Sequence, residues 1–270
     1  MRIAIEHKTT YRYPGEVQHT AQYLHLTPRN NASQWVIDWH IRAPGQMTAW
    51  EDCYGNTCHT LVEDRPTTEI VIIAKGRVDT TDTNGILPPE DDEPPVEIFL
   101  RPTSLTRING AIRDFSSGFA DGIGGDIVVG LHALMMGIRE RVSFETHASN
   151  AQSTAADALI AGAGVCQDHA HLFIACCRSL GVPARYVGGY LFDGDQTAAY
   201  TAGHAWAAAW VPVLGWVAFD VANRICATEN HIGVSVGLDY NDVAPIRGIR
   251  AGGQGDEQME VAVWVGAGNQ

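Results

Sequence analysis

The sequence predicts an α+β fold in which an antiparallel β-rich domain precedes a mixed core. Three observations support this. Short alternating apolar and polar runs fill residues 1–83, a proline- and acid-rich stretch occupies residues 84–103, and helical spacing begins only within residues 104–270. In that last part helices come first and strands follow, an order typical of α+β cores. We therefore expect two domains joined by a linker.

The first domain is expected to be an antiparallel β-sandwich. Runs such as 35–41 and 69–74 are short and rich in β-formers, and they are separated by Pro, Gly and Asn turns. Residues 84–95 contain four prolines and four acids, which exclude a helix or a central strand there. We interpret residues 84–103 as the linker.

The core is expected to begin with helices. Apolar residues recur at helical spacing over 127–142, and Ser153 or Thr154 can cap a short helix that ends near residue 160. A third, amphipathic helix is expected over 166–180. The strands expected after it span about 184–192, 203–211, 215–221 and 258–265.

Composition narrows the class of function. The chain has 270 residues, 45% of them hydrophobic, enough for a substantial buried core. Eighteen basic against 31 acidic residues give a net charge of -13, which argues against nucleic acid or an anionic membrane surface as the main partner. No apolar run is long enough for a transmembrane helix, so no membrane partner is expected.

The cysteines and the first residues predict a cytoplasmic location. Met1–His7 contains a glutamate and a histidine where a secretory signal would need an unbroken apolar run. Six cysteines, with Cys176 and Cys177 adjacent on a helix, do not resemble a disulfide framework. A reducing compartment would keep such thiols active.

Cys166 is a candidate nucleophile. It follows the small-residue turn Gly164–Val165 and begins the helix that stops at Gly181, with Pro183 two residues later. The positive end of the helix dipole and the unpaired N–H groups of the first turn favour a thiolate. Position alone leaves open that Cys166 is a small buried hydrophobe, as most free cysteines are.

Two aromatic-rich runs downstream supply candidates for the other catalytic groups. Residues 203–210 and 215–220 read as a β-hairpin. If the turn is centred on Pro212, His204 and Asp220 lie directly opposite each other, close enough for the carboxylate to accept a hydrogen bond from the imidazole. A turn displaced by one residue would stagger this pair without separating it. Nucleophile, base and orienting carboxylate are the parts of a catalytic triad.

These motifs resemble the bacterial transglutaminase-like superfamily of cysteine hydrolases. The resemblance rests on 164–173 (GVCQDHAHLF), 181–191 (GVPARYVGGYL), His204-Ala205-Trp206 and the hairpin that closes on Phe219-Asp220. Segments 10–13, 26–29, 52–56 and 239–245 resemble the branch with a β-rich N-terminal domain. The resemblance implies a papain-like, transglutaminase-like core with Cys166 as nucleophile, His204 as general base and acid, and Asp220 as the carboxylate that orients the imidazole.

Two groups of residues could be drawn as metal sites, but structural roles are favoured for both. His169 and His171 could join His204, but on a helical wheel His171 points away from His169 and Cys166. Asp168 is more simply an acid favoured in the first helical turn.

Cys53, Cys58 and His59 surround a turn signal and show no fourth ligand nearby. Cys226 is expected to pack in the core. No metal and no other cofactor is expected.

The substrate cleft is less well defined. Trp206 and Trp216 share the parity of His204, so they are either walls of the cleft or core residues. One oxyanion donor is expected to be the backbone N–H of Cys166. Gln152 is a weak candidate for the second donor.

The sequence therefore predicts a cysteine-dependent amide hydrolase, a peptidase or amidase, that acts on a peptide or another amide through a thioester acyl-enzyme. One alternative is a transglutaminase, which would pass the acyl group to an amine. Another is a binding module of the same fold without activity. Hydrolysis is favoured because the residues between Cys166 and His204 are largely used by one helix and two strands, which leaves no insertion to shield the thioester from water. Substrate identity and oligomeric state are not predicted.

Overall fold

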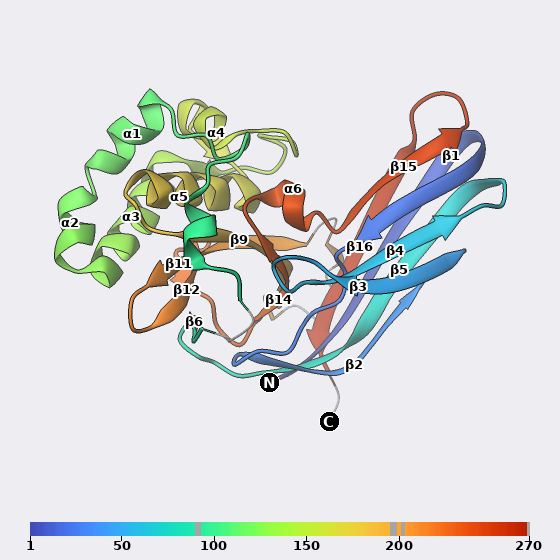
Figure 1. Cartoon of the computed structure of the whole chain (residues 1–270), viewed down its shortest axis with the longest axis horizontal. Helices are drawn as coiled ribbons and strands as arrows, with labels where there is room; N and C mark the ends of the chain where they lie inside the picture. The colour runs from blue at the N-terminus through green and yellow to red at the C-terminus, as the bar shows by residue number, and fades with distance from the viewer. Residues whose placement is uncertain (90–92, 195–198, 201–202, 269–270) are drawn as a thin grey trace.

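The computed structural model describes residues 1–89, 93–194, 199–200 and 203–268. Figure 1 shows a long twisted β-sheet on one side and a mixed α/β body on the other. The α+β prediction is confirmed, as is the antiparallel character of the N-terminal part.

The N-terminal sheet is organised around one long strand, β1 (Arg2–Leu24). Its first half pairs with β5 and β16, and its second half pairs with β4 and β15. Its partners, directly or through a neighbour, are β2 (Gln34–Arg42), β3 (Gln46–Glu51), β4 (Thr57–Glu63), β5 (Thr67–Thr80), β10 (Ala199–Tyr200), β15 (Ile246–Gly252) and β16 (Gln258–Ala267). All these pairs are antiparallel, so the sheet is one curled hydrogen-bonded unit.

The end of the chain differs from the predicted division. The expected final strand exists as β16, but it pairs with β1 in the N-terminal sheet, and β15 does the same. The predicted catalytic unit, residues 104–270, thus gives its last two strands to the other part of the molecule. Figure 1 shows these strands, in red, beside β1. Periodicity finds a strand but does not identify its partner.

The predicted linker is a packed segment in its described portion. Residues 86–87 form β6 (Ile86–Leu87), which pairs with β12, and residues 96–100 form the 3-10 helix η1 (Val96–Leu100). Phe99 is buried, and Glu93 accepts hydrogen bonds from Arg185 (2.7 Å) and Trp216 (3.0 Å). The prolines exclude regular long elements, as predicted, but not tertiary packing.

The helices of the body follow from their caps. The three predicted helices are confirmed as α3 (Ile127–Arg141), α4 (Ala155–Ala161) and α5 (Cys166–Ser179). Asp126 caps α3, and Thr154 and Asp157 form a reciprocal capping box on α4. Gly181 ends the α5 region in the left-handed conformation (φ 75°) that glycine adopts without strain. Three short helices were not predicted: α1 (Gly110–Ser117), α2 (Ala120–Gly125) and α6 (Tyr240–Val243).

A second sheet lies against α5. Its strands run in the order β13 (Ile225–Cys226), β12 (Gly215–Asp220), β11 (His204–Val211), β9 (Ala184–Leu191) and β14 (His231–Gly237). Two short strands, β7 (Ser143–Phe144) and β8 (Ala163–Gly164), pair separately. The odd-numbered residues of β11 and β12 pack toward the helices, and the even-numbered residues face the opposite side.

Helix α5 is more deeply buried than an amphipathic helix. Every residue from Asp168 to Arg178 is buried, because helices cover one side and the sheet covers the other. The Arg178 guanidinium donates to four oxygens, those of Phe99, Thr106, Ala184 and Leu238, at 2.7–2.9 Å. The predicted amphipathic character is therefore wrong, because the helix has no solvated face between Asp168 and Arg178. The charged Arg178 is buried there because its four hydrogen bonds replace those to water.

Two amide side chains join the N-terminal sheet to the outer strand of the body. Gln34 donates to the carbonyl of Gly233 (2.7 Å) and accepts from its N–H (2.9 Å). Asn56 makes the same pair of bonds with Val236 (2.7 and 2.8 Å). Each amide thus satisfies a peptide group of β14 much as a neighbouring strand would, at about 0.5–1.5 kcal/mol per bond. The two parts are fastened together along β14.

Candidate active site

The turn before α5 presents Cys166 at the start of the helix. Val165 has an extended backbone, and its N–H donates to the carboxylate of Asp168 at 2.8 Å. A Cβ at Gly164 would meet the Asp168 side chain at 2.7 Å, so only glycine fits this approach. Asp168 thus acts within the first helical turn, the role favoured by the sequence. Cys166 is half-buried.

The hairpin brings His204 and Asp220 together in a staggered register. Trp210 pairs with Trp216, so the turn is centred on Val213, one residue beyond the predicted Pro212. His204 and Asp220 are therefore not directly opposite, but they remain on one face of the sheet. The Nε2 of His204 lies 2.7 Å from Oδ2 of Asp220.

Asp220 has two further partners that the sequence did not reveal. His231 Nε2 lies 3.0 Å from Asp220 Oδ2, and the Asn223 side-chain amide donates to the same oxygen at 2.7 Å. The N–H of Thr228 donates to His231 Nδ1 (3.0 Å), so Nε2 carries the proton and donates to the carboxylate. His231 lies on β14, which does not neighbour β12, so hairpin arithmetic could not find it.

Burial and hydrogen bonding shift the proton affinities of this pair in opposite directions. Burial alone would lower the pKa of His204, but its contacts with the Asp220 carboxylate and the Cys166 sulfur raise it to about 10. Burial opposes ionisation of Asp220, yet the hydrogen bonds from His204, His231 and Asn223 hold its pKa well below the usual range. At neutral pH the arrangement therefore favours an imidazolium held by a carboxylate.

Cys166 and His204 line one cavity of about 320 Å³. Because His204 Nε2 is taken by Asp220, Nδ1 is the nitrogen left for the thiol. On the other side, His204 pairs with Gly189 of β9, where a Cβ would meet the carbonyl oxygen of Ile232 at 2.1 Å. Only glycine therefore fits at position 189, the cross-strand partner of His204.

The residues expected to form the cleft lie elsewhere. Trp206 and Trp216 are 4% and 1% exposed, and neither lines the cavity that contains Cys166. Trp216 packs at right angles to Phe99 (5.0 Å between ring centroids), so both tryptophans belong to the core. Gln152 is exposed on the loop before α4 and also does not line the cavity.

The histidines of the metal site that the sequence disfavours, His169, His171 and His204, do not form one cluster. His169 places its ring nitrogens 2.8 and 3.1 Å from the carbonyls of Val165 and Val142. His171 accepts from the N–H of Tyr240 (3.1 Å), and burial lowers its pKa to about 3. The two rings thus form hydrogen bonds with the backbone of different segments: His169 with Val165 and Val142, and His171 with Tyr240.

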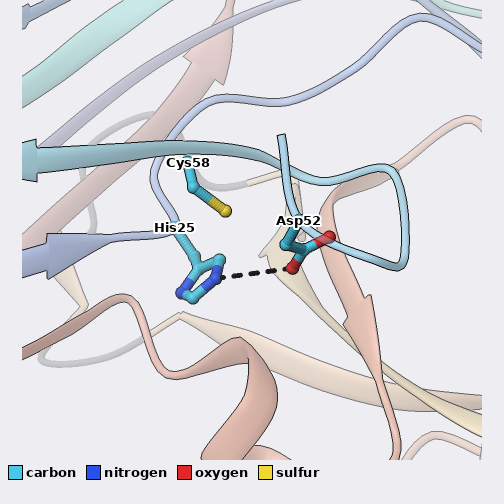
Figure 2. Close-up of side chains that lie close together, drawn as sticks. All are labelled: His25, Asp52 and Cys58. Atoms are coloured by element: carbon cyan, nitrogen blue, oxygen red, sulfur yellow. Dashed lines mark ion pairs between the residues drawn. The ribbon is translucent and has the colours of Figure 1, made fainter. Parts of the chain in front are cut away.

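A separate cluster forms from His25, Asp52 and Cys58. Figure 2 shows the three side chains converging, with a contact of 3.8 Å between His25 and Asp52. Their potential ligand atoms lie within 4.8 Å of one another. However, Asp52 also accepts from the N–H groups of Tyr54 and Asn56 at 2.9 Å and from the Asn56 amide at 2.8 Å. This carboxylate holds the turn that the sequence predicted between the cysteines.

The comparisons with known proteins agree with this architecture. The model of the transglutaminase-like superfamily matches residues 118–221, and the model of the bacterial transglutaminase-like N-terminal region matches residues 3–79. The chain belongs to the transglutaminase-like superfamily. The first match includes Cys166, His204 and Asp220, and the second includes most of the N-terminal sheet.

Proteins from several bacteria are similar to this chain over nearly its whole length. The uncharacterized protein ML0607 of Mycobacterium leprae is 30% identical over 97% of both chains. The uncharacterized protein Rv2569c of Mycobacterium tuberculosis is 29% identical over 92% of this chain and 87% of its own. The crystal structure of a proposed cysteine protease from Cytophaga hutchinsonii shares the fold, with a TM-score of 0.77 at 21% identity over 100% of this chain and 91% of its own.

Within the described residues, no helix has the length and apolar character needed to span a bilayer.

Proposed function

We propose that this transglutaminase-like protein is a cysteine-dependent amide hydrolase, a peptidase or amidase. The observation that carries the proposal is that Cys166 and His204 line one cavity while Asp220 holds the far nitrogen of His204 at 2.7 Å. These are the parts that acyl transfer through a thioester requires. The description of the Cytophaga hutchinsonii protein as a proposed cysteine protease supports the same class of reaction.

In the acylation step, the thiolate of Cys166 attacks the amide carbonyl and His204 donates a proton to the leaving amine. The raised pKa of His204 keeps that proton available at neutral pH. The backbone N–H of Cys166, the first residue of α5, has no acceptor within the helix, so it can stabilise the negative oxygen of the tetrahedral intermediate.

In the deacylation step, His204 removes a proton from water, and the resulting hydroxide attacks the thioester carbonyl. The C–S bond breaks, the carboxylic acid leaves, and the Cys166 thiolate and the protonated His204 are restored. Cys166 is only half-buried and the side chain of His204 is 15% exposed, so solvent reaches the reacting atoms. Water at this site favours hydrolysis over transfer to an amine. The six free cysteines suit a reducing compartment.

The test is a panel of labelled amide substrates with purified protein, with and without millimolar primary amine. We expect free acid as the main product under both conditions. Mostly amine-linked product would replace hydrolysis by transglutamination and leave the triad in place. No turnover of any amide, with Cys166 unreactive toward iodoacetamide, would support the inactive binding module instead.

A further inference from the structure

We propose that the N-terminal sheet forms one wall of the substrate cavity, and that the cavity binds an uncharged apolar or aromatic side chain on the acyl side of the scissile amide. This inference rests on the proposed function, because it assigns the substrate class of the same site. It gives the N-terminal sheet a direct part in substrate selection.

The wall comes from two adjacent strands of the sheet, one from each end of the chain. His7, Thr9 and Tyr11 of β1 line the cavity, and Met259 and Val261 of β16 lie beside them in the adjacent strand. The opposite side is formed by Cys166, His204 and residues of β9 and α6. The space next to the thiol is therefore enclosed between the two parts of the molecule.

The alternation of both strands keeps charge out of this space. Glu6, Lys8 and Arg12 on β1 are exposed on the other face of the strand, and Glu260 on β16 pairs there with Arg12 at 2.9 Å. Among the described residues that line the cavity, none is Asp, Glu, Lys or Arg. Apart from the Cys166–His204 pair itself, the described lining therefore carries no charged side chain beside the thiol.

Two polar groups of the wall, His7 and Thr9, are already engaged in hydrogen bonds. The Nδ1 of His7 lies 2.9 Å from the Tyr190 hydroxyl, and its Nε2 lies 3.1 Å from the Thr9 hydroxyl. Burial lowers the pKa of His7 to about 4, so this histidine is neutral under ordinary conditions. A charged side chain of the substrate would lose water against this wall, which offers no charge of opposite sign. An apolar or aromatic side chain has no such cost.

The wall is fixed in place. Ile3, Ile5 and Val263 of the N-terminal sheet share one buried cluster with Tyr190 and Ile232 of the body. The amide pairs along β14 fasten the same two parts. Substrate therefore meets a preformed pocket, which is the condition for selecting a side chain by shape and polarity.

The experiment measures alkylation of Cys166 by three N-acyl aminoacyl chloromethyl ketones that differ only in side chain: phenylalanine, glutamate and lysine. Rates are read by mass spectrometry of the peptide that contains Cys166. We expect the phenylalanine reagent to react at least about tenfold faster than either charged one. Equal rates for the three reagents would overturn the proposal.

Charge variants of the wall test its location. Met259 is 61% exposed, so Met259→Lys and Met259→Glu are compatible with folding. We expect Met259→Lys to raise the relative rate of the glutamate reagent and Met259→Glu that of the lysine reagent. Gln258→Lys and Gln258→Glu, on the same strand but outside the cavity lining, are the matched controls and should change neither.

Labelling with iodoacetamide distinguishes failure of the wall assignment from failure of the proposed hydrolase function. If Cys166 reacts rapidly with iodoacetamide but the Met259 variants do not change the selectivity, the wall assignment is wrong and the proposed hydrolase stands. If Cys166 is no more reactive than the buried cysteines, the proposed function fails and this inference fails with it.

Discussion

The described residues include two groups of a cysteine, a histidine and an aspartate, and the proposed function assigns catalysis to only one of them. In the first, His25 and Asp52 are 3.8 Å apart, beside Cys58. In the second, His204 and Asp220 are 2.7 Å apart and share a site with Cys166. Residue types alone therefore do not define the chemistry.

The difference lies in what else each group does. Cys58 is fully buried, its S–H donates to the carbonyl of Asn56 (3.4 Å), and burial raises its pKa to about 12. Its neighbour Asp52 is occupied by the turn. Cys166 instead begins a helix at the edge of a cavity, and the carboxylate of Asp220 acts on the imidazole. In the first cluster Asp52 holds a turn by hydrogen bonds. In the second, Cys166 is the thiol that we propose to react.

The largest effect is expected from the two cysteines. Cys166→Ala should lower kcat/KM by roughly 10⁴-fold or more, because removal of a nucleophile leaves only binding and oxyanion stabilisation. Cys58→Ala should retain most activity and instead lower the thermal midpoint. Steady-state kinetics and thermal denaturation of both variants check this. Equal loss of activity in the two variants would erase the distinction between the clusters.

The histidines provide the next test. His204→Ala should slow iodoacetamide labelling of Cys166 at neutral pH, since the thiolate loses its imidazolium partner. His25→Ala should leave that rate unchanged. Mass-spectrometric mapping of all six cysteines gives both rates, and in the unaltered protein Cys166 should label first. Its appearance among the slowest sites would count against a nucleophilic role.

The pH dependence follows from the raised pKa of His204, about 10 against an ordinary value near 6.5. A raised pKa means that the protonated imidazole contributes stability fully below about pH 6.5 and loses it as pH rises through about 10. We expect kcat/KM to fall on the same alkaline limb, because His204 can no longer protonate the leaving amine. The difference in free energy of unfolding between the unaltered protein and His204→Gln should disappear over the same pH interval. As the control, His25→Ala should show the same alkaline fall in kcat/KM as the unaltered protein.

A smaller effect is expected from His231. Its hydrogen bond orients Asp220, so His231→Ala should reduce kcat by roughly 10- to 100-fold, the effect of losing one hydrogen bond to a charged group. The alkaline limb should also move to lower pH, because Asp220 then holds His204 less firmly. His231→Gln, which can still donate, should recover part of both losses. A loss of stability without a change in the pH profile would make His231 structural only.

The smallest effect is expected from metal removal. EDTA should leave activity unchanged, because the proposed reaction uses no metal and Asp52 is engaged by its turn. Dialysis against EDTA followed by assay with and without added zinc checks this. Activity that is lost and then restored by zinc would assign a metal to one of the two clusters.

Local signals predicted much of this structure. The cap residues located α4, the stop at Gly181 closed the α5 region, and the order of Cys166, His204 and Asp220 pointed to one site. Each of these signals depends on neighbours within a few residues or on one hairpin. The chemical roles of the three residues remain proposals that the experiments above test.

Long-range pairing could not be predicted in the same way. The spacing of residues along the chain indicates neither the pairing of β16 with β1 nor the hydrogen bond between His231 and Asp220. The tryptophans show the same limit, since parity placed Trp206 and Trp216 on the correct face but could not show that the segment around Phe99 covers Trp216. A burial pattern records that a residue is covered and not what covers it.

The pairing of β1 with β16 also determines the order in which the protein can be completed. Arg12 and Gln258 are paired partners, so this part of the sheet closes only when residues made early meet residues made late. Contacts of such long sequence separation form slowly. A ribosome releases Cys166, His204 and Asp220 before it releases β16. A chain still being synthesised therefore carries Cys166 without the second wall of the cavity. If the proposals above hold, selective action on a substrate has to wait until β1 and β16 have paired.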